Sequence, residues 1–547
     1  MAGRIQIPVI VTLILASAPA SSMPIETNSD IHLNWDNTLQ GTLIGQPGTE
    51  RFGPAGRCSP MSGLTAREAE LFACVPRSGL TSSRVDWWSH LTASYQDFGF
   101  DVTSTAWYDF SYDSWKTRAS SAPGIPLTSY FTSRGNDPDG YIELLDAFLY
   151  GTTSLGADQP LSFRIGREVS PWGESLYFVH NGIAGGQAPI NAYQNPTNGY
   201  SQASETFLPV GQASFNWQPA NGLTVLGYYQ FEWRRDRINP YDPYNSTLTI
   251  LGGDDLNDDT RQILLPSGAG TAPIVFNRTK SLLPGSTDQF GLGLRWRADD
   301  FDWGLYGVSF NAKTPEFYFR PPTVAGSNFG TFNLVFPKEI ESVGVSVSGP
   351  LGDASFGAEL SARTRMPLVN AGIVLPAGDA AADNNVHPRY PIGDTLQGQF
   401  SWLYTTPPLP GIPGGASWSG EVAANDLLSA TENAARLVPG RTHAAAALRT
   451  VFEPQFYQIR PRLDLSVPIG LGYNFLGLSE VDSTMNRGTA DLSVGAALTF
   501  DRSWKFTLSG THYFGVTENA FLPTKPSGFR EPLNNGDFVS LSVARSF

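Results

Sequence analysis

Charged side chains recur at every second position in several stretches of this sequence, with apolar side chains between them. In 289–297, for example, Arg295 and Arg297 alternate with Leu294 and Trp296. A two-residue period places the two kinds of side chain on opposite faces of a β-strand. A face that carries both signs could select solutes by charge and dipole; ion pairs that only stiffen the protein are the alternative. The residues on this charged face are Arg164, Glu168, Glu232, Arg234, Arg295, Arg297, Glu359, Arg363, Arg365, Arg449, Glu453, Arg462 and Asp464.

The segment 170–210 is the second candidate for function, because it combines aromatic residues and glycines with few charges. A loop of this composition that folds into a pore would form a constriction or a gate. A mobile surface loop is the alternative. The residues expected in the constriction are Trp172, Glu174, Tyr177, Phe178, Asn181, Gly185 and Gly186.

Carboxylates cluster in GGDDLNDDT (252–260). The spacing of Asp255, Asn257 and Asp259 begins like a calcium-binding EF-hand loop, and oxygen ligands suit calcium. Thr260, however, stands where that loop requires glycine. These three residues are therefore weak calcium candidates, and we predict a solvated acidic loop without a metal.

The other reactive side chains do not form an enzymatic pattern. The 6 histidines are scattered, and none has the spacing of a metal site. Because an enzyme needs a positioned nucleophile and base, we predict no enzymatic activity and no cofactor. The net charge of −14 argues against nucleic acid as a partner.

Two cysteines, Cys58 and Cys74, lie in the predicted loop 43–84. They are too few for a structural zinc site. In an oxidising compartment they are expected to form a disulfide.

The elements that must position these residues are long strands. The alternating segments have about twice the usual strand length of ~5–6 residues and match the ~9–11 tilted residues that cross a bilayer. The expected strands cover 31–42, 85–96, 99–111, 141–151, 161–169, 211–218, 222–234, 288–297, 302–312, 339–348, 353–365, 394–405, 417–426, 441–453, 461–472, 488–500, 503–515 and 536–547.

The connections between these strands alternate between short and long. Outer-membrane barrels have short periplasmic turns and long extracellular loops. The prediction is therefore an all-β fold: one transmembrane antiparallel β-barrel of about 18 strands, with both termini on the periplasmic side. The charged face would then line the lumen.

Both ends of the chain carry export signals. Arg4, the apolar run 5–16 and an Ala-x-Ala site at 18–20 predict a signal peptide over 1–20, which leaves 21–547 as the barrel. At the other end, Val539, Leu541, Val543 and Phe547 would face outer-membrane lipid. This terminal pattern resembles the signal by which the barrel-assembly machinery recognises bacterial outer-membrane proteins.

Several stretches resemble the bacterial outer-membrane family catalogued as domain of unknown function 1302. They include PWGESLYFVHNGIAGGQAPI (171–190), LRWRADDFDWGLYGV (294–308), FEPQFYQIRPRLDLSVPIGLGY (452–473) and DFVSLSVARSF (537–547). The resemblance implies a barrel in the outer membrane of a Gram-negative bacterium. It also implies two partners, an outer-membrane lipoprotein and an inner-membrane exporter of the resistance-nodulation-division type.

The function expected from these features is a passive conduit for a restricted class of hydrophobic or amphipathic solutes, working with periplasmic partners. The apolar segment 170–210 favours this function. The charged face favours a hydrophilic diffusion porin, and the long outer loops would also suit a non-conducting scaffold or adhesin.

Overall fold

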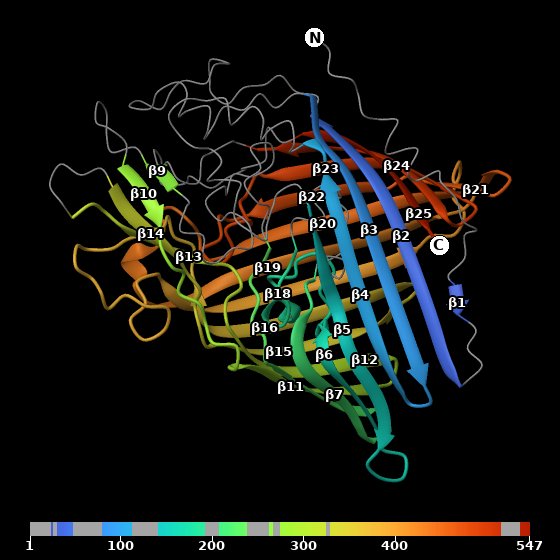
Figure 1. Cartoon of the computed structure of the whole chain (residues 1–547), viewed down its shortest axis with the longest axis horizontal. Helices are drawn as coiled ribbons and strands as arrows, with labels where there is room; N and C mark the ends of the chain where they lie inside the picture. The colour runs from blue at the N-terminus through green and yellow to red at the C-terminus, as the bar shows by residue number, and fades with distance from the viewer. Residues whose placement is uncertain are drawn as a thin grey trace.

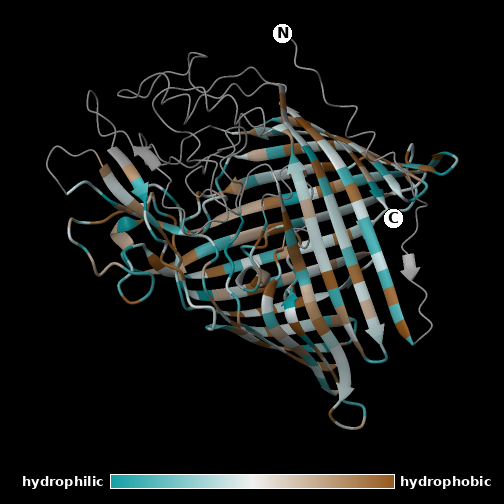
Figure 2. Cartoon of the chain, in the orientation of Figure 1, coloured by the Kyte–Doolittle hydropathy of each residue, from teal (hydrophilic) through white to brown (hydrophobic). Residues whose placement is uncertain are grey.

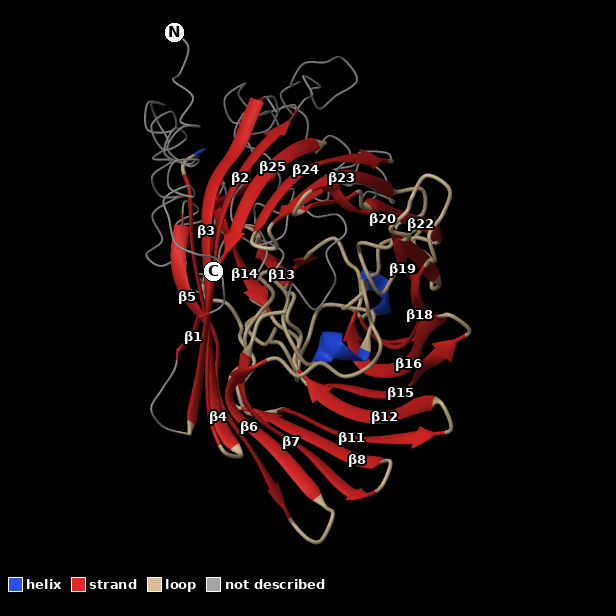
Figure 3. Cartoon of the chain, turned by 90° about the vertical axis from the view of Figure 1, so that its right-hand side faces the viewer, coloured by secondary structure: helices blue, strands red, loops and turns tan. Residues whose placement is uncertain are grey.

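The protein is a closed antiparallel β-barrel (Figures 1 and 3). The computed structural model describes residues 23–25, 30–46, 79–111, 140–191, 207–237, 262–265, 274–323, 329–515 and 537–547. Consecutive strands pair around the ring, and β25 (Phe538–Ser546) closes it by pairing with β2 (Ile31–Gln46). The short β21 (Leu463–Ser466) and β22 (Ile469–Leu476) share one place in the ring, because both pair with β20 and with β23.

The ring therefore has eighteen strand positions, which confirms the predicted fold and strand number. A further short strand, β1 (Met23–Ile25), pairs only with the start of β2. Between β2 and β25, and apart from β21 and β22, the wall consists of β3 (Gly79–Tyr95), β4 (Phe98–Asp109), β5 (Gly140–Ser154), β6 (Pro160–Glu168), β7 (Val210–Ala220), β8 (Leu223–Gln230), β11 (Gln289–Ala298), β12 (Phe301–Phe310), β15 (Ile340–Leu351), β16 (Ala354–Pro367), β18 (Ile392–Thr405), β19 (Ala416–Glu432), β20 (Ala445–Arg460), β23 (Ala490–Phe500) and β24 (Trp504–Phe514).

The two-residue period of the sequence becomes the two faces of the wall. In β15, Val343 and Val345 are exposed on the outer face, whereas Ser342 and Ser346 are buried on the inner face. The same alternation of apolar and polar residues runs along most of the strands in Figure 2. An apolar outer face and a polar inner face are the arrangement of a barrel that lies in lipid.

The two ends of the barrel differ in their connections. At one end the turns are short, as at 96–97, 221–222 and 501–503. Asp501 and Arg502 have positive φ angles of 54° and 60°, as tight hairpin turns require. The start of β2 and the last residues of the chain lie at this end of the barrel, because Ile31 pairs with Tyr95 and the backbone N–H of Ser546 donates to the Ser503 carbonyl.

The long loops at the other end carry a second sheet, which we call the cap sheet (Figure 1). Its five strands are β9 (Gln262–Leu265), β10 (Ile274–Arg278), β13 (Glu316–Arg320), β14 (Phe329–Val335) and β17 (Ile373–Val374). They come from three different connections of the barrel. The cap sheet therefore ties these loops into one layer at the long-loop end.

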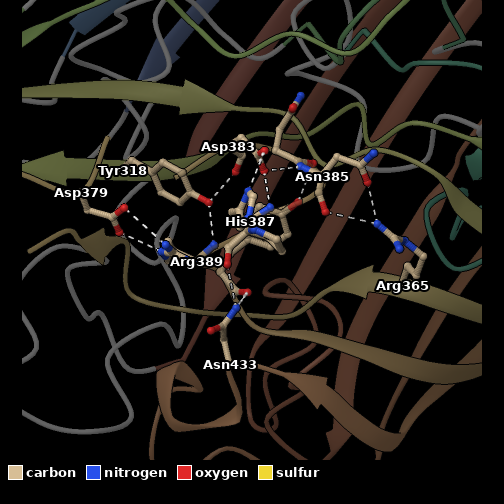
Figure 4. Close-up of polar contacts among 11 residues, drawn as sticks. Tyr318, Arg365, Asp379, Asp383, Asn385, His387, Arg389 and Asn433 are labelled. Carbon is tan, nitrogen blue, oxygen red and sulfur yellow. Dashed lines mark hydrogen bonds and ion pairs between the residues drawn. The ribbon is translucent and has the colours of Figure 1, made fainter. Parts of the chain in front are cut away.

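A polar network fixes residues 379–389, which follow β17, beside the cap sheet (Figure 4). The hydroxyl of Tyr318 donates to the Asp383 carbonyl at 2.8 Å and accepts from the Arg389 backbone N–H at 2.7 Å. The Arg389 guanidinium donates to the Asp379 carboxylate, and this hydrogen bond holds the pKa of Asp379 below its usual range. Burial alone would raise the pKa of Asp383, but N–H donors such as those of Asn385 and His387 lower it.

Several predicted features fall outside the described residues: the signal peptide, the cysteines Cys58 and Cys74, and the acidic cluster with Asp255, Asn257 and Asp259. Within the described residues, helical structure is limited to short turns, such as Ile183–Gly186 and Ala434–Arg436. None of the helices in this part of the chain has the length and apolar character needed to span a membrane.

Candidate functional site

The connection between β6 and β7 turns into the barrel instead of staying at its rim. We call its described part, residues 169–191, the lumen loop. In Figure 3, loop segments occupy part of the space within the ring of strands. The contacts described below join the lumen loop to the inner faces of β8, β12, β15, β16, β18 and β19.

The carboxylate of Glu421, on the inner face of β19, accepts hydrogen bonds from three consecutive backbone N–H groups of the lumen loop. These belong to Leu176, Tyr177 and Phe178, and the bond from Phe178 measures 2.8 Å. Glu421 is fully buried. Three donors of the loop thus converge on one buried side chain of the wall, so Glu421 anchors this part of the loop.

A second carboxylate, Glu359 on β16, anchors the loop on both sides of the first anchor. Its two oxygens accept from the backbone N–H of Glu174 at 2.7 Å and that of Ile183 at 3.0 Å. The side-chain amide of Gln399, on β18, also donates to Glu359 at 2.7 Å. The two wall carboxylates together bind five backbone N–H groups of the lumen loop.

Arg363, on the same inner face of β16 as Glu359, binds the loop through its carbonyls. Its guanidinium donates to the backbone oxygens of His180, Asn181 and Gly182 at 2.8, 2.9 and 2.7 Å. The wall therefore supplies acceptors for the N–H groups of the loop and a donor for its carbonyls.

Apolar contacts fix the loop against the β8–β15 side of the wall. Trp172 is 5% exposed and lies edge-on to Tyr228, with ring centroids 5.0 Å apart, and stacked on Tyr306 at 5.6 Å. Ile183 belongs to the same buried cluster. A Cβ on Gly344 of β15 would lie 2.6 Å from the Cδ1 atom of Ile183, so the loop packs closely against the wall at this glycine.

The opposite side of the loop reaches β18 and β19. Phe178 packs on a buried cluster that includes Ala423 and Met485. The side-chain amide of Asn181 donates to the Gln399 side chain at 3.2 Å. The lumen loop therefore lies along the inner face of one continuous part of the wall, from β8 to β19.

The structure places the predicted constriction residues inside the barrel. Gly185 lines a cavity there, and the carbonyl of Gly186 accepts from the Lys313 Nζ at 2.8 Å. Burial lowers the pKa of Lys313 to about 8. The placed residues are Trp172, Glu174, Tyr177, Phe178, Asn181, Gly185 and Gly186. Their effect on passage through the barrel stays a prediction.

Several residues of the predicted charged face lie on the inner side of strands. Arg295 lies 3.8 Å from Glu174 of the lumen loop, and Arg449 pairs with Asp491 at 2.6 Å. Glu168 is buried and accepts from Ser214. The residues on wall strands are Arg164, Glu168, Arg295, Arg297, Glu359, Arg363, Arg365, Arg449, Glu453 and Asp464.

The predicted strand positions of Glu232, Arg234 and Arg462 are wrong. β8 ends at Gln230, and the backbone N–H groups of Phe231 and Glu232 both bond to the Gly211 carbonyl, which ends the regular ladder. Glu232 pairs instead with Arg167, and Arg234 pairs with Glu143. Arg462 lies in the turn before β21, with a φ of 65°, and pairs with Asp501 in another short turn.

Sequence reasoning missed three residues that hold the lumen loop: Glu421, Gln399 and Asn425. Glu421 and Asn425 lie within the predicted strand 417–426 and share the parity of Ser419. The same parity argument that selected Glu359 could therefore have found Glu421.

Two cavities lie on different sides of the lumen loop. One of about 320 Å³ faces the long-loop end and is lined by residues such as Phe310, Lys313 and Met366. The other, of about 590 Å³, lies against the wall formed by β4–β7 and is lined by residues such as Tyr150 and Arg164. The loop is therefore anchored on one side of the lumen and leaves space on the other.

Glu316, in the cap sheet, makes the stability of that sheet depend on pH. Burial raises the pKa of Glu316 to about 7, against an opposing hydrogen bond from Asn370. Between pH ~4.5 and ~7 the folded cap binds the proton more tightly than the unfolded chain does, so its stability falls as pH rises through this range. Because Glu316 is partly exposed, we expect the free energy of unfolding of the cap sheet to fall by about 2 kcal/mol over this pH range.

Hydrogen–deuterium exchange of the β13 and β14 amides at pH 5 and pH 8, corrected for intrinsic rates, measures this change. Glu316→Gln should abolish the difference, and Glu341→Gln, which removes an exposed carboxylate of β15, should preserve it. Equal protection at both pH values in the unmodified protein would contradict the prediction.

One known protein family matches this chain over almost its whole length. The family described as "Protein of unknown function (DUF1302)" matches residues 6–547. The chain is also similar to the solved structure of OccAB1 of Acinetobacter baumannii, at 10% identity and a TM-score of 0.42, over 96% of this chain and 99% of that one. Curated proteins give no match to this chain.

Two further solved structures are similar. One is OpdK of Pseudomonas aeruginosa with vanillate, at 10% identity and a TM-score of 0.41, over 94% of this chain and 98% of that one. The other is Salmonella typhi OmpF in complex with daunomycin, at 8% identity and a TM-score of 0.37, over 96% and 100%.

Proposed function

We propose that this chain, which belongs to the family described as DUF1302, is a passive outer-membrane channel for a restricted class of hydrophobic or amphipathic solutes. One observation carries the proposal: the lumen loop is held inside a large barrel, against one side of its wall, by Glu359, Arg363 and Glu421. A barrel of 16–18 strands leaves an aqueous channel unless loops narrow it. A loop that is fixed in the lumen would narrow this channel for every solute.

The space beside the loop supports a restricted path. The cavity against β4–β7 contains the aromatic rings of Phe148 and Tyr150 together with the charged Arg164 and Asp101. Arg164 lies over the Phe148 ring, 5.3 Å from its centroid. A path lined by both aromatic rings and charged side chains suits solutes that have both apolar and polar parts.

A hydrophilic diffusion porin is the second candidate, favoured by the exposed guanidinium of Arg164, whose side chain is 50% exposed. Export by a signal peptide, recognition by the barrel-assembly machinery, and partnership with an outer-membrane lipoprotein and an inner-membrane exporter belong to the proposal as well. They are supported by the sequence signals and the family resemblance.

Single-channel recording of the refolded barrel in a planar bilayer tests the proposal, with and without deletion of residues 175–190. We expect little conductance in the intact protein and a clear conductance after deletion, because the deleted segment contains the residues bound by Glu421. A large steady conductance in the intact protein would instead support the hydrophilic porin. Silence in both proteins would contradict a channel.

A further inference from the structure

The cavity of about 320 Å³ lies between the lumen loop and the loops of the long-loop end. The half-buried residues Pro315, Phe317, Met366 and Pro367 form an apolar part of its lining. Cavities that bind small molecules are mostly apolar, with a few polar groups that fix the orientation of the ligand. The charged groups that a solute can reach therefore decide which ligand this cavity suits.

The lysine and the arginine that line the cavity, Lys313 and Arg363, are occupied by the lumen loop. The Nζ atom of Lys313 donates to the Gly186 carbonyl at 2.8 Å, and the guanidinium of Arg363 donates to three loop carbonyls. Both residues are buried, with exposed fractions of 6% and 4%. A solute in the cavity therefore has little access to either cation.

Two carboxylates of the cavity have positive partners within the protein. Asp236 attracts Lys313, and its Oδ2 atom lies 3.8 Å from Nε2 of the exposed His180. Asp482 is half-buried and attracts Arg363. The protein therefore already compensates part of the negative charge of both groups.

Glu316, the third carboxylate of the cavity, has no such partner. It is half-buried and accepts a hydrogen bond from the side-chain amide of Asn370. Within the described part of the chain it forms no ion pair. Burial raises the pKa of Glu316 to about 7, and the Asn370 hydrogen bond is the only interaction that opposes this rise among the described residues. Because a buried charge is costly unless it is paired, a positively charged ligand would stabilise the ionised form of Glu316.

We propose that this cavity binds a solute that carries one positively charged nitrogen on an apolar body. The N–H groups of the solute donate to the Glu316 carboxylate, and the apolar body lies against Pro315, Met366 and Pro367. An ammonium group supplies donors and a charge but no acceptor, so it matches an unpaired carboxylate. This inference rests on the proposed function, because it names the class of amphipathic solute that the channel would hold on the long-loop side of the lumen loop.

Calorimetric titration of the barrel in nanodiscs of zwitterionic lipid at pH 7.5 tests the inference. Cyclohexylammonium is the probe, and empty nanodiscs are the blank. We expect saturable binding of the probe and binding weaker by about tenfold or more for cyclohexanol and cyclohexanecarboxylate, which keep the ring without the positive charge. Methylammonium keeps the charge without the ring, and it should also bind about tenfold more weakly or worse.

Variants assign the binding to Glu316. Glu316→Gln keeps the size of the side chain but removes its charge, so it should weaken binding of cyclohexylammonium about tenfold. Glu341→Gln, which changes an exposed carboxylate of β15 outside the cavity, should leave binding unchanged. Circular dichroism checks that both variants fold.

The pH dependence of binding gives a second readout. Affinity for the probe should rise between pH 5 and pH 7.5, because Glu316 loses its proton in this range, and the rise should be absent in Glu316→Gln. Histidines also titrate in this range, and His180 lines the cavity. His180→Asn should therefore retain the rise, whereas its loss in this variant would overturn the assignment to Glu316.

Absence of saturable heat above the blank would overturn the inference, as would tighter binding of the carboxylate, equal binding of methylammonium, or a loss in Asp482→Asn in place of Glu316→Gln. The conductance of the same preparations separates this inference from the proposed function. A barrel that conducts after deletion of 175–190 but does not bind the probe when intact overturns only the binding site. A barrel that binds the probe but is silent with and without the deletion overturns the channel.

Discussion

Replacing Glu359 and Glu421 together by alanine is expected to raise the single-channel conductance of the barrel several-fold. The double variant leaves five backbone N–H groups of the lumen loop without their acceptors. Each buried donor that loses its partner costs about 1–3 kcal/mol. The bound position of the loop should therefore lose its advantage over detached positions, and the loop should leave the path open for part of the time.

Planar-bilayer recording measures this effect as a larger mean conductance with added open-state noise. The matched control is Asp36→Ala, which removes a carboxylate of β2 that bonds locally to Asn34. The control should conduct like the unmodified barrel. An equal rise in both proteins would mean that lumen charge, rather than the anchoring of the loop, sets the conductance.

Trp172→Ala is expected to release the lumen loop from β8 and β12, which lie apart from the strands that carry Glu359 and Glu421. The indole is buried against Tyr228 and Tyr306, and the loss of a buried aromatic ring costs about 3–5 kcal/mol. When opening is fast, proteolysis follows the population of the open form. Cleavage by chymotrypsin after Tyr177 or Phe178 should therefore accelerate by roughly a hundredfold or more.

Mass spectrometry of the refolded barrel locates and times this cleavage. Trp87→Ala is the control, because Trp87 of β3 is 42% exposed and its indole N–H donates to Asn37 of β2. An unchanged cleavage rate in Trp172→Ala would show that the polar anchors alone hold the loop.

The fold could be predicted because each wall strand carries its own two-residue period. Strand limits are harder to predict where the period breaks. β19 continues to Glu432, beyond the predicted end at 426, although Leu427 and Leu428 interrupt the alternation. β8 stops at Gln230, although alternation continues through Glu232 and Arg234, because the backbone bonds of Phe231 and Glu232 converge on one carbonyl.

The anchoring of the lumen loop could not be predicted, since its partners are distant in sequence. Composition indicated that the segment enters a pore, but Glu421 lies 245 residues from Leu176 and Glu359 lies 176 residues from Ile183. Parity shows which face a side chain occupies. It does not show which distant segment that face binds.

These separations also constrain the order in which the protein folds. The lumen loop precedes β7 in the chain, but its anchors stand on β16 and β19. Contacts between distant parts of a chain form late, because the loop-closure entropy must be overcome first. The segment must therefore stay unanchored while most of the wall assembles, and the interior reaches its final form only after β19 has joined the sheet.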